Sequence, residues 1–144
     1  MKNRAFTLIE MMVVLVIIGI LMGLILAGVF TAMESAKVSN AEANIATLEA
    51  SISMYEVDVG SYPPLWQWNV CHHLTGEGIV KPIGWNGPYI HFKDEDTNAA
   101  GIFLDPWDQM YNYGIPGTQN PGFVDIYSLG PDKTSGTSDD ITNW

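Results

Sequence analysis

The sequence predicts an α+β protein in which one long N-terminal helix, transmembrane in its first half and amphipathic in its second, packs on a small antiparallel β-sheet. Three observations predict this arrangement. Residues 11–30 form an uninterrupted apolar run, and residues 31–59 contain neither glycine nor proline. All eight prolines, eleven of the fourteen glycines and all five tryptophans lie between residues 60 and 144, where turns and short strands are therefore expected.

Length and charge narrow the possible functions. The 144 residues allow one modest domain. The balance of 6 Lys and Arg against 16 Asp and Glu gives a net charge of -10, which repels a polyanion and argues against a nucleic-acid partner. Cys71 is the only cysteine, so the chain cannot close an internal disulfide. Hydrophobic residues make up 47% of the chain and charged residues only 15%. This is more apolar than a water-facing domain of this size needs, which indicates that part of the chain faces lipid.

Residues 11–30, MMVVLVIIGILMGLILAGVF, carry no charge and no hydrogen-bonding side chain. A helix rises about 1.5 Å per residue, so this run covers roughly the 30 Å of a bilayer's hydrocarbon. Lys2 and Arg4 precede the run and the next basic residue is Lys37, so the positive-inside rule places the N-terminus in the cytoplasm. A cleaved secretory signal is the alternative, but its apolar core has only about 7 to 15 residues.

The segment after the apolar run has the pattern of an amphipathic helix. Its apolar residues recur at intervals of three and four: Val38, Ala41, Ile45, Leu48, Ile52, Tyr55 and Val59. Glu42, Glu49 and Glu56 fall on another face at seven-residue spacing and are expected to form a solvated helix surface. We therefore expect one helix from Phe6 to about Asp58.

Residues 60–144 are expected to form the sheet. The best strand candidate is residues 123–129, with residues 101–104 and 110–115 as partners. Residues 66–74, WQWNVCHHL, are expected to form a short helix. A sheet of this size is marginal alone, so the apolar stripe of residues 38–59 should cover it.

Glu10 is a carboxylate at the start of an apolar helix, where it costs free energy unless it is paired or reaches the membrane surface. Reaching the headgroups is one interpretation. The other is pairing with a cation that this part of the chain lacks, because no basic side chain lies between Arg4 and Lys37. Cleavage between Ala5 and Phe6 would create an α-amino group with a pKa of roughly 7.7 to 8.0, and this amine could pair with Glu10.

The stretch KNRAFTLIEMMVVLVIIGIL resembles the processing and assembly segment of type IV pilins and of the pseudopilins of type II secretion systems. The resemblance implies that a membrane prepilin peptidase removes a leader of residues 1–5 and methylates the new N-terminal Phe6. It also implies that Glu10 pairs with the N-terminal amine of a neighbouring subunit during filament assembly. Two departures are Ala5, where the family usually has glycine, and Ala27, where many members have a proline that bends the helix.

The C-terminal part narrows the resemblance. The runs GSYPPLW, GWNGPYI, DPWDQMYNY and VDIYSLGPDKTSGTSDDITNW are similar, in order and spacing, to the major pseudopilins of type II secretion. The resemblance implies a pilin-like fold with a leader at residues 1–5, a transmembrane and filament-core helix at 6–30, and a periplasmic globular domain at 31–144 that includes the amphipathic half of the helix.

The last loop has the composition of a cation site. Asp132, Asp139 and Asp140 lie in a stretch that also contains Gly130 and Gly136. Hard cations such as Ca²⁺ take six to eight oxygen ligands, although an Asp/Gly turn explains the same spacing. The resemblance implies that this loop binds calcium through the three aspartates, with backbone carbonyls such as that of Leu129 completing the shell.

Other clusters have simpler interpretations. Adjacent histidines point in different directions, so Cys71, His72 and His73 are not expected to form a site. Asp105 and Asp108 flank Trp107, and two nearby carboxylates are the catalytic pair of many glycosidases. The run DPWD is better explained as a turn whose tryptophan anchors the core. Residues 94–96, DED, are expected to be a solvated loop.

The resemblance therefore predicts a structural subunit and not an enzyme: a single-pass inner-membrane protein that assembles into a helical periplasmic filament and drives export of folded periplasmic proteins across the outer membrane. The implied partners are other copies of the chain, the prepilin peptidase, other pseudopilins and inner-membrane secretion proteins. One alternative is a type IV pilin of a surface pilus for adhesion or motility, although such pilins often have a C-terminal disulfide. Another is a single-pass periplasmic enzyme or metal-binding module.

Overall fold

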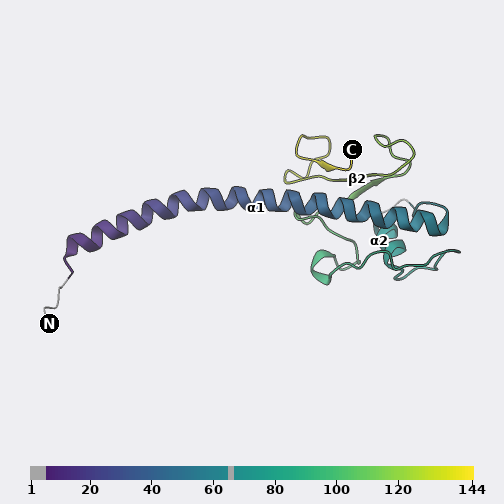
Figure 1. Cartoon of the computed structure of the whole chain (residues 1–144), viewed down its shortest axis with the longest axis horizontal. Coiled ribbons are helices and arrows are strands. Elements are labelled where there is room, and N and C mark those ends of the chain that lie inside the picture. Colours follow the sequence, from purple (N-terminus) through teal and green to yellow (C-terminus); the bar gives the residue numbers. More distant parts are fainter. Residues whose placement is uncertain (1–5, 65–66) are drawn as a thin grey trace. The chain divides into compact units, whose positions relative to one another are not determined.

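A computed structural model describes residues 6–64 and 67–144. The predicted leader, residues 1–5 with Ala5, and residues 65–66 lie outside the described residues. The chain divides into two compact units, Met1–Ala36 and Lys37–Trp144. Helix α1 (Leu8–Val59), labelled in Figure 1, has residues in both units, and its bounds agree closely with the helix predicted from Phe6 to about Asp58.

The first unit exposes its apolar side chains. Within α1, an 18-residue window has a mean hydropathy of 3.1, and none of it is buried. Phe6 is 74% exposed and Leu24 is 71% exposed. By length and composition this helix can cross a membrane, as the sequence predicts.

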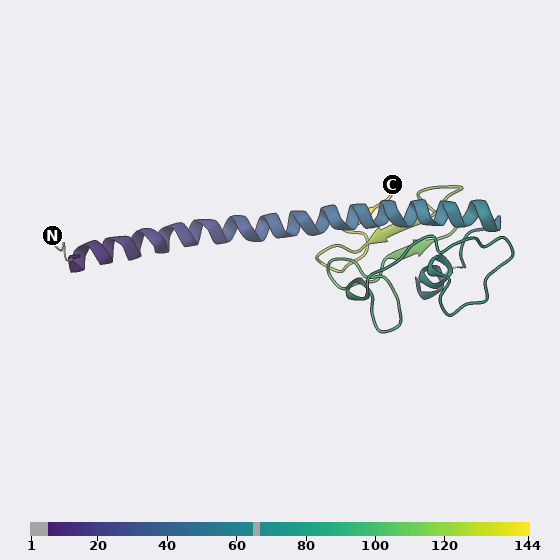
Figure 2. The same cartoon turned by 60° about the horizontal axis from the view of Figure 1, so that its bottom comes forward.

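The second unit has its core along one face of α1. The predicted stripe is confirmed, because five of its members are at most 3% exposed: Ala41, Ile45, Leu48, Ile52 and Tyr55. Val38 and Val59 are partly buried at its ends. Figure 2 shows the strands and helix α2 beside this part of α1. The stripe is therefore the surface on which the rest of the unit packs.

The sheet has three antiparallel strands in the order β1-β2-β3. Strand β1 is Asn112–Gly114, β2 is Asp125–Ser128 and β3 is Ile141–Thr142. In register, Tyr113 faces Ile126 and Ser128 faces Ile141. Strand β2 is central in this order, and it contributes to the core because Ile126 within it and Val124 just before it are fully buried. The strands predicted within 110–115 and 123–129 are confirmed.

The prediction of a strand at residues 101–104 was wrong. Phe103 and Leu104 form only isolated bridges, with Thr97 and Met110. Two turns prevent a longer ladder. Before the segment, the Asn98 side chain accepts the N–H of residues 100 and 102, and after it Asp105 accepts N–H groups of the next turn. The third strand is β3 instead, for which the sequence analysis predicted no strand.

Helix α2 (Gln67–Thr75) confirms the predicted short helix within the described residues, Trp66 lying outside them. Val70 and Leu74 are fully buried against the core. The long segment that follows has one 3-10 helix, η1 (Asp94–Asp96), whose residues are exposed as predicted for this acidic run. Aromatic stacking anchors the segment, since Phe103 stacks on both Phe92 and Tyr111.

The glutamate face of α1 differs from the expected solvated surface. Glu42 is exposed, but Glu49 and Glu56 are half-buried. Asn143 donates from Nδ2 to Oε1 of Glu49 at 2.7 Å. Glu49 therefore ties the C-terminal end of the chain to the helix. Helical periodicity predicted the side of α1 that Glu49 occupies, but not a polar partner 94 residues away in the sequence.

A buried carboxylate fixes the turn between β1 and β2. Asp125 is 6% exposed and accepts the backbone N–H groups of Thr118, Gln119 and Asn120 at 2.6 to 2.9 Å. Burial alone would raise the pKa of Asp125, but the three N–H groups outweigh it and hold the pKa below its usual value.

We expect D125N to lower the stability of the second unit by about 2 kcal/mol, because an amide group replaces one of the oxygens that these N–H donors need. The charged form stabilises the fold fully above the unfolded-state pKa of about 3.9, and this contribution is lost as pH falls through the lower folded-state pKa. Urea melts from pH 3 to 7 should therefore show a smaller acid-linked loss in D125N than in the wild type. D94N, on the exposed η1, is the matched control, and equal pH profiles for D125N and wild type would contradict the expectation.

Candidate functional site

The start of α1 is closed by a reciprocal pair of residues. Thr7 Oγ1 accepts the backbone N–H of Glu10 at 3.3 Å, and Oε2 of Glu10 accepts the backbone N–H and the hydroxyl of Thr7 at 2.8 and 2.7 Å. This is a capping box, in which the N-cap threonine and a glutamate three residues later satisfy each other's free backbone donors. Glu10 is therefore held at the first turn of the helix.

Sequence analysis identified Glu10 but missed Thr7. The signal that could have found it is the spacing Thr-x-x-Glu before an apolar run. Phe6, the predicted new N-terminal residue, is exposed just before the cap. Ala5, on the other side of the predicted cleavage point, lies outside the described residues. The processing and assembly roles of these residues stay predictions.

The second predicted site is the loop between β2 and β3, residues 129–140. Its three aspartates accept hydrogen bonds from the loop itself. Asp132 accepts the N–H of Thr134 at 2.7 Å, and Asp140 accepts the N–H of Gly136 at 2.7 Å. Asp139 accepts the N–H of Asp132 at 3.1 Å, which joins the two arms of the loop. The structure thus brings Asp132 and Asp139 into contact.

Gly130 closes the loop at its base. Its φ of +65° lies in the left-handed region, and a Cβ at this position would lie 2.2 Å from the carbonyl oxygen of Asp139. Only a glycine allows the two arms to approach this closely. Leu129 immediately precedes this crossing point, at the base of the loop that contains the three aspartates.

The carboxylates of Asp139 and Asp140 differ in how well the loop satisfies them with hydrogen bonds. The hydroxyl of Thr137 and then the N–H of Asp132 hold the pKa of Asp139 below its usual value. Oδ1 of Asp140 is buried and has no hydrogen-bond partner among the described residues. A buried acceptor without a donor costs free energy, so this oxygen is one that a cation would satisfy.

The structure does not gather all three carboxylates around one point. Among the described residues, no group of three or more His, Cys, Asp and Glu side chains lies close enough to hold a metal. The loop does line a cavity of about 350 Å³, to which Asp139, Asp140 and Glu42 of α1 contribute. Calcium binding therefore stays a prediction: carboxylate oxygens are ligands that a hard cation takes, and the unpartnered Oδ1 of Asp140 is the observation that favours an ion.

The predicted turn at Asp105 is confirmed. Asp105 is 4% exposed, and its Oδ1 accepts the N–H groups of Trp107 and Gln109 at 2.9 Å. Its Oδ2 accepts the hydroxyl of Ser128. Trp107 is buried as the expected core anchor. The carboxylate of Asp105 is therefore engaged in holding the turn against β2.

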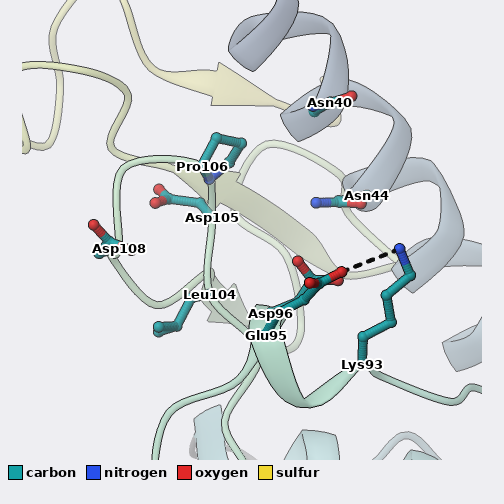
Figure 3. Close-up of a pocket in the computed structure, with 9 residues that line it drawn as sticks. All are labelled: Asn40, Asn44, Lys93, Glu95, Asp96, Leu104, Asp105, Pro106 and Asp108. Carbon is teal, nitrogen blue, oxygen red and sulfur yellow. Dashed lines mark ion pairs between the residues drawn. The ribbon is translucent and has the colours of Figure 1, made fainter.

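Asp105 and Asp108 also border a polar cavity of about 390 Å³ (Figure 3). The cavity is lined from α1 by Asn40 and Asn44, and Lys93 forms an exposed ion pair with Glu95 at its edge, at 3.5 Å. Both oxygens of Asp105 already accept hydrogen bonds from the protein, Oδ1 from its own turn and Oδ2 from Ser128 of β2, so this carboxylate has a structural role at the border of the cavity.

Cys71 and His73 make packing contacts. The N–H of Phe103 donates to Sγ of Cys71 at 3.5 Å, and burial raises the pKa of the thiol. Nδ1 of His73 lies 3.1 Å from the hydroxyl of Tyr55, and burial lowers the pKa of His73. Both side chains therefore belong to the interface between α1, α2 and the long segment that follows.

A capped apolar helix that continues into the core of a small antiparallel α+β unit is the architecture of the pilin-like class of filament proteins. The comparisons agree. Residues 1–26 match the family model for the prokaryotic N-terminal methylation motif, and residues 28–144 match the model for type II secretion system protein G. The chain belongs to the type II secretion system protein G family.

Relatives match along nearly the whole chain. The type II secretion system core protein G of Pseudomonas aeruginosa is 38% identical over 99% of this chain and 96% of its own length. That of Escherichia coli K12 is 35% identical over 99% and 92%. A crystal structure of the major pseudopilin from the type 2 secretion system of enterohaemorrhagic E. coli matches with a TM-score of 0.59 and 26% identity, covering 79% of this chain and 87% of that one. The resemblance to major pseudopilins is confirmed and is favoured over a surface-pilus pilin.

Proposed function

We propose that this chain is the subunit from which a type II secretion system builds its pseudopilus, a helical filament whose growth moves folded periplasmic proteins toward the outer membrane. The observation that carries the proposal is the exposed apolar half of α1. In the single chain, no part of its most apolar 18-residue window is buried. Such a surface needs lipid before assembly and neighbouring copies after it. The match of residues 28–144 to protein G supports the secretion system as the setting.

Processing supplies the charge that assembly needs. Removal of residues 1–5 by a prepilin peptidase leaves an amine at Phe6, a position next to the capping box. Both bonds from Thr7 end on one oxygen of Glu10, whereas a carboxylate has about four acceptor positions. The amine of a neighbouring copy can thus be added without breaking the cap. This pairing offsets the cost of a carboxylate in the membrane and fixes the stagger between neighbouring subunits.

The orientation follows from charge. Lys2 and Arg4 keep the N-terminus in the cytoplasm, and the unit Lys37–Trp144 lies in the periplasm. The inner membrane is thus the reservoir of subunits. Other pseudopilins and inner-membrane secretion proteins take the subunit from this reservoir. The chain acts as a structural subunit and catalyses no reaction.

The C-terminal loop holds calcium in this proposal. The carboxylates of Asp132, Asp139 and Asp140, with the carbonyl of Leu129, would hold the ion. Support comes from the unpartnered buried oxygen of Asp140 and from the closure of the loop at Gly130. The ion supplies positive charge that offsets repulsion among the carboxylates. The chain's own contribution is the hydrogen bond from Asp132 to Asp139, which already holds the arms together.

Deletion of the gene in the native host tests the proposal. We expect the proteins that the system secretes to accumulate in the periplasm, and a plasmid copy of the chain to return them to the medium. A plasmid copy of a related minor pseudopilin is the control and should not restore secretion. Normal secretion in the deletion strain would contradict the proposal.

A further inference from the structure

Asn143 makes an unusual number of contacts for a residue next to the C-terminus. Its Nδ2 donates to Oε1 of Glu49 at 2.7 Å and to the carbonyl of Val124 at 2.9 Å. Its Oδ1 accepts the N–H of Ile126 at 2.9 Å and the side-chain amide of Asn120 at 3.3 Å. One side chain therefore joins α1, the central strand and the turn between β1 and β2.

These contacts matter because β3 is short. The strand has two residues, Ile141 and Thr142, and pairs with β2 at only those two positions. The backbone N–H of Asn143 adds one bond, to the carbonyl of Ile126 at 3.1 Å. The side chain of Asn143 thus adds four hydrogen bonds directly after a strand of only two residues.

The loop of residues 129–140 is held at both ends by this arrangement. Its first end leaves β2, where Ser128 is fully buried. Its second end, with Asp139 and Asp140, leads directly into β3 and Asn143. Asn143 therefore holds the strand into which Asp139 and Asp140 lead, and it acts in addition to the hydrogen bond between Asp132 and Asp139.

We infer that Asn143, docked on Glu49, is a positioning residue that holds Asp139 and Asp140 in place for the cation, so that calcium binding and docking of the C-terminal strand on α1 stabilise each other. The inference rests on the calcium loop of the proposed function. Coupling of this kind is reciprocal: if docking favours the ion, the ion favours docking by the same factor.

The test uses the full chain in detergent. All five tryptophans lie at residue 66 or later, so their fluorescence reports on the second unit alone during calcium titration. We expect N143A to weaken calcium binding by about fivefold or more, the low end of typical coupling between sites. E49A should weaken it in the same direction, and the double variant should bind no more weakly than N143A. E56A, one helical heptad further along α1, is the matched control and should bind like the wild type.

Glu49→Ala keeps the test decisive if N143A fails to fold, because it leaves every other bond of Asn143 in place. A second readout is hydrogen exchange at the Asn143 amide, which calcium should slow in the wild type and slow less in E49A. Wild-type calcium affinity in both E49A and N143A would overturn the inference and leave the calcium loop standing. Absence of calcium binding in the wild type would overturn both.

Discussion

Replacing Glu10 by alanine is expected to abolish filament assembly while the chain stays folded and membrane-bound. The substitution removes the carboxylate that we propose pairs with the α-amino group of Phe6 in the next subunit. Alanine offers that amine no acceptor in its place. The apolar window of α1 is unchanged, so membrane insertion persists. Assembly is measured by shearing filaments from cells that overproduce the chain and by electron microscopy of the sheared fraction, where the variant should give none.

Two further variants separate pairing from capping. E10Q keeps an acceptor for the Thr7 hydrogen bonds but removes the charge, and it should fail to assemble. T7V removes the hydroxyl of the capping box, at a cost of about 1 kcal/mol to the helix start, but keeps the carboxylate, and it should assemble. Normal filaments from E10A and E10Q would contradict charge pairing. Loss of assembly in T7V alone would mean that Glu10 acts by capping α1 and not by pairing with the amine.

Removal of calcium is expected to give the second large effect. A ligand at a hundredfold over its dissociation constant stabilises a fold by about 2.7 kcal/mol. Each kcal/mol shifts the melting temperature of a domain of this size by roughly 4 to 8 °C. The full chain in detergent, melted in excess calcium and then in chelator, should therefore differ by more than about 10 °C.

The aspartates decide whether this shift belongs to the loop. A variant with Asp139 and Asp140 both replaced by alanine should melt at the same temperature with and without calcium. D108A removes an exposed carboxylate elsewhere and should keep the full shift. If the wild type shows no shift, residues 129–140 are an Asp/Gly turn and the calcium proposal fails. If the double variant keeps the shift, the ion binds at another place.

Periodicity and composition predicted most of the fold because both report burial. The stripe of α1 and the central strand were found this way, since Ile52 and Ile126 must both leave water. The strand β3 was missed because two residues carry no periodic signal, and what places them is the side chain of Asn143. Residues 101–104 were predicted as a strand from composition, but the Asn98 turn limits them to single bridges.

For the candidate sites, the sequence predicted which residues take part better than it predicted the contacts that they make. The position of Glu10 in an apolar helix and the resemblance both indicated this residue, whereas its contact with Thr7 was missed although the spacing Thr-x-x-Glu is a capping-box signal. For the loop, spacing indicated three aspartates near each other. The structure adds that Asp132 and Asp139 meet through a backbone N–H, and that Asp140 has the oxygen without a partner. Hydrogen bonds between distant segments, such as the one from Asn143 to Glu49, leave no pattern in a single sequence.

The central claim is that a processed form of this chain is the filament subunit. Intact mass spectrometry of the sheared filament fraction tests it most directly. We expect one dominant species that begins at Phe6, lacks residues 1–5 and carries one added methyl group at its N-terminus. Filaments that contain the unprocessed 144-residue chain, or filaments without this chain, would contradict this claim.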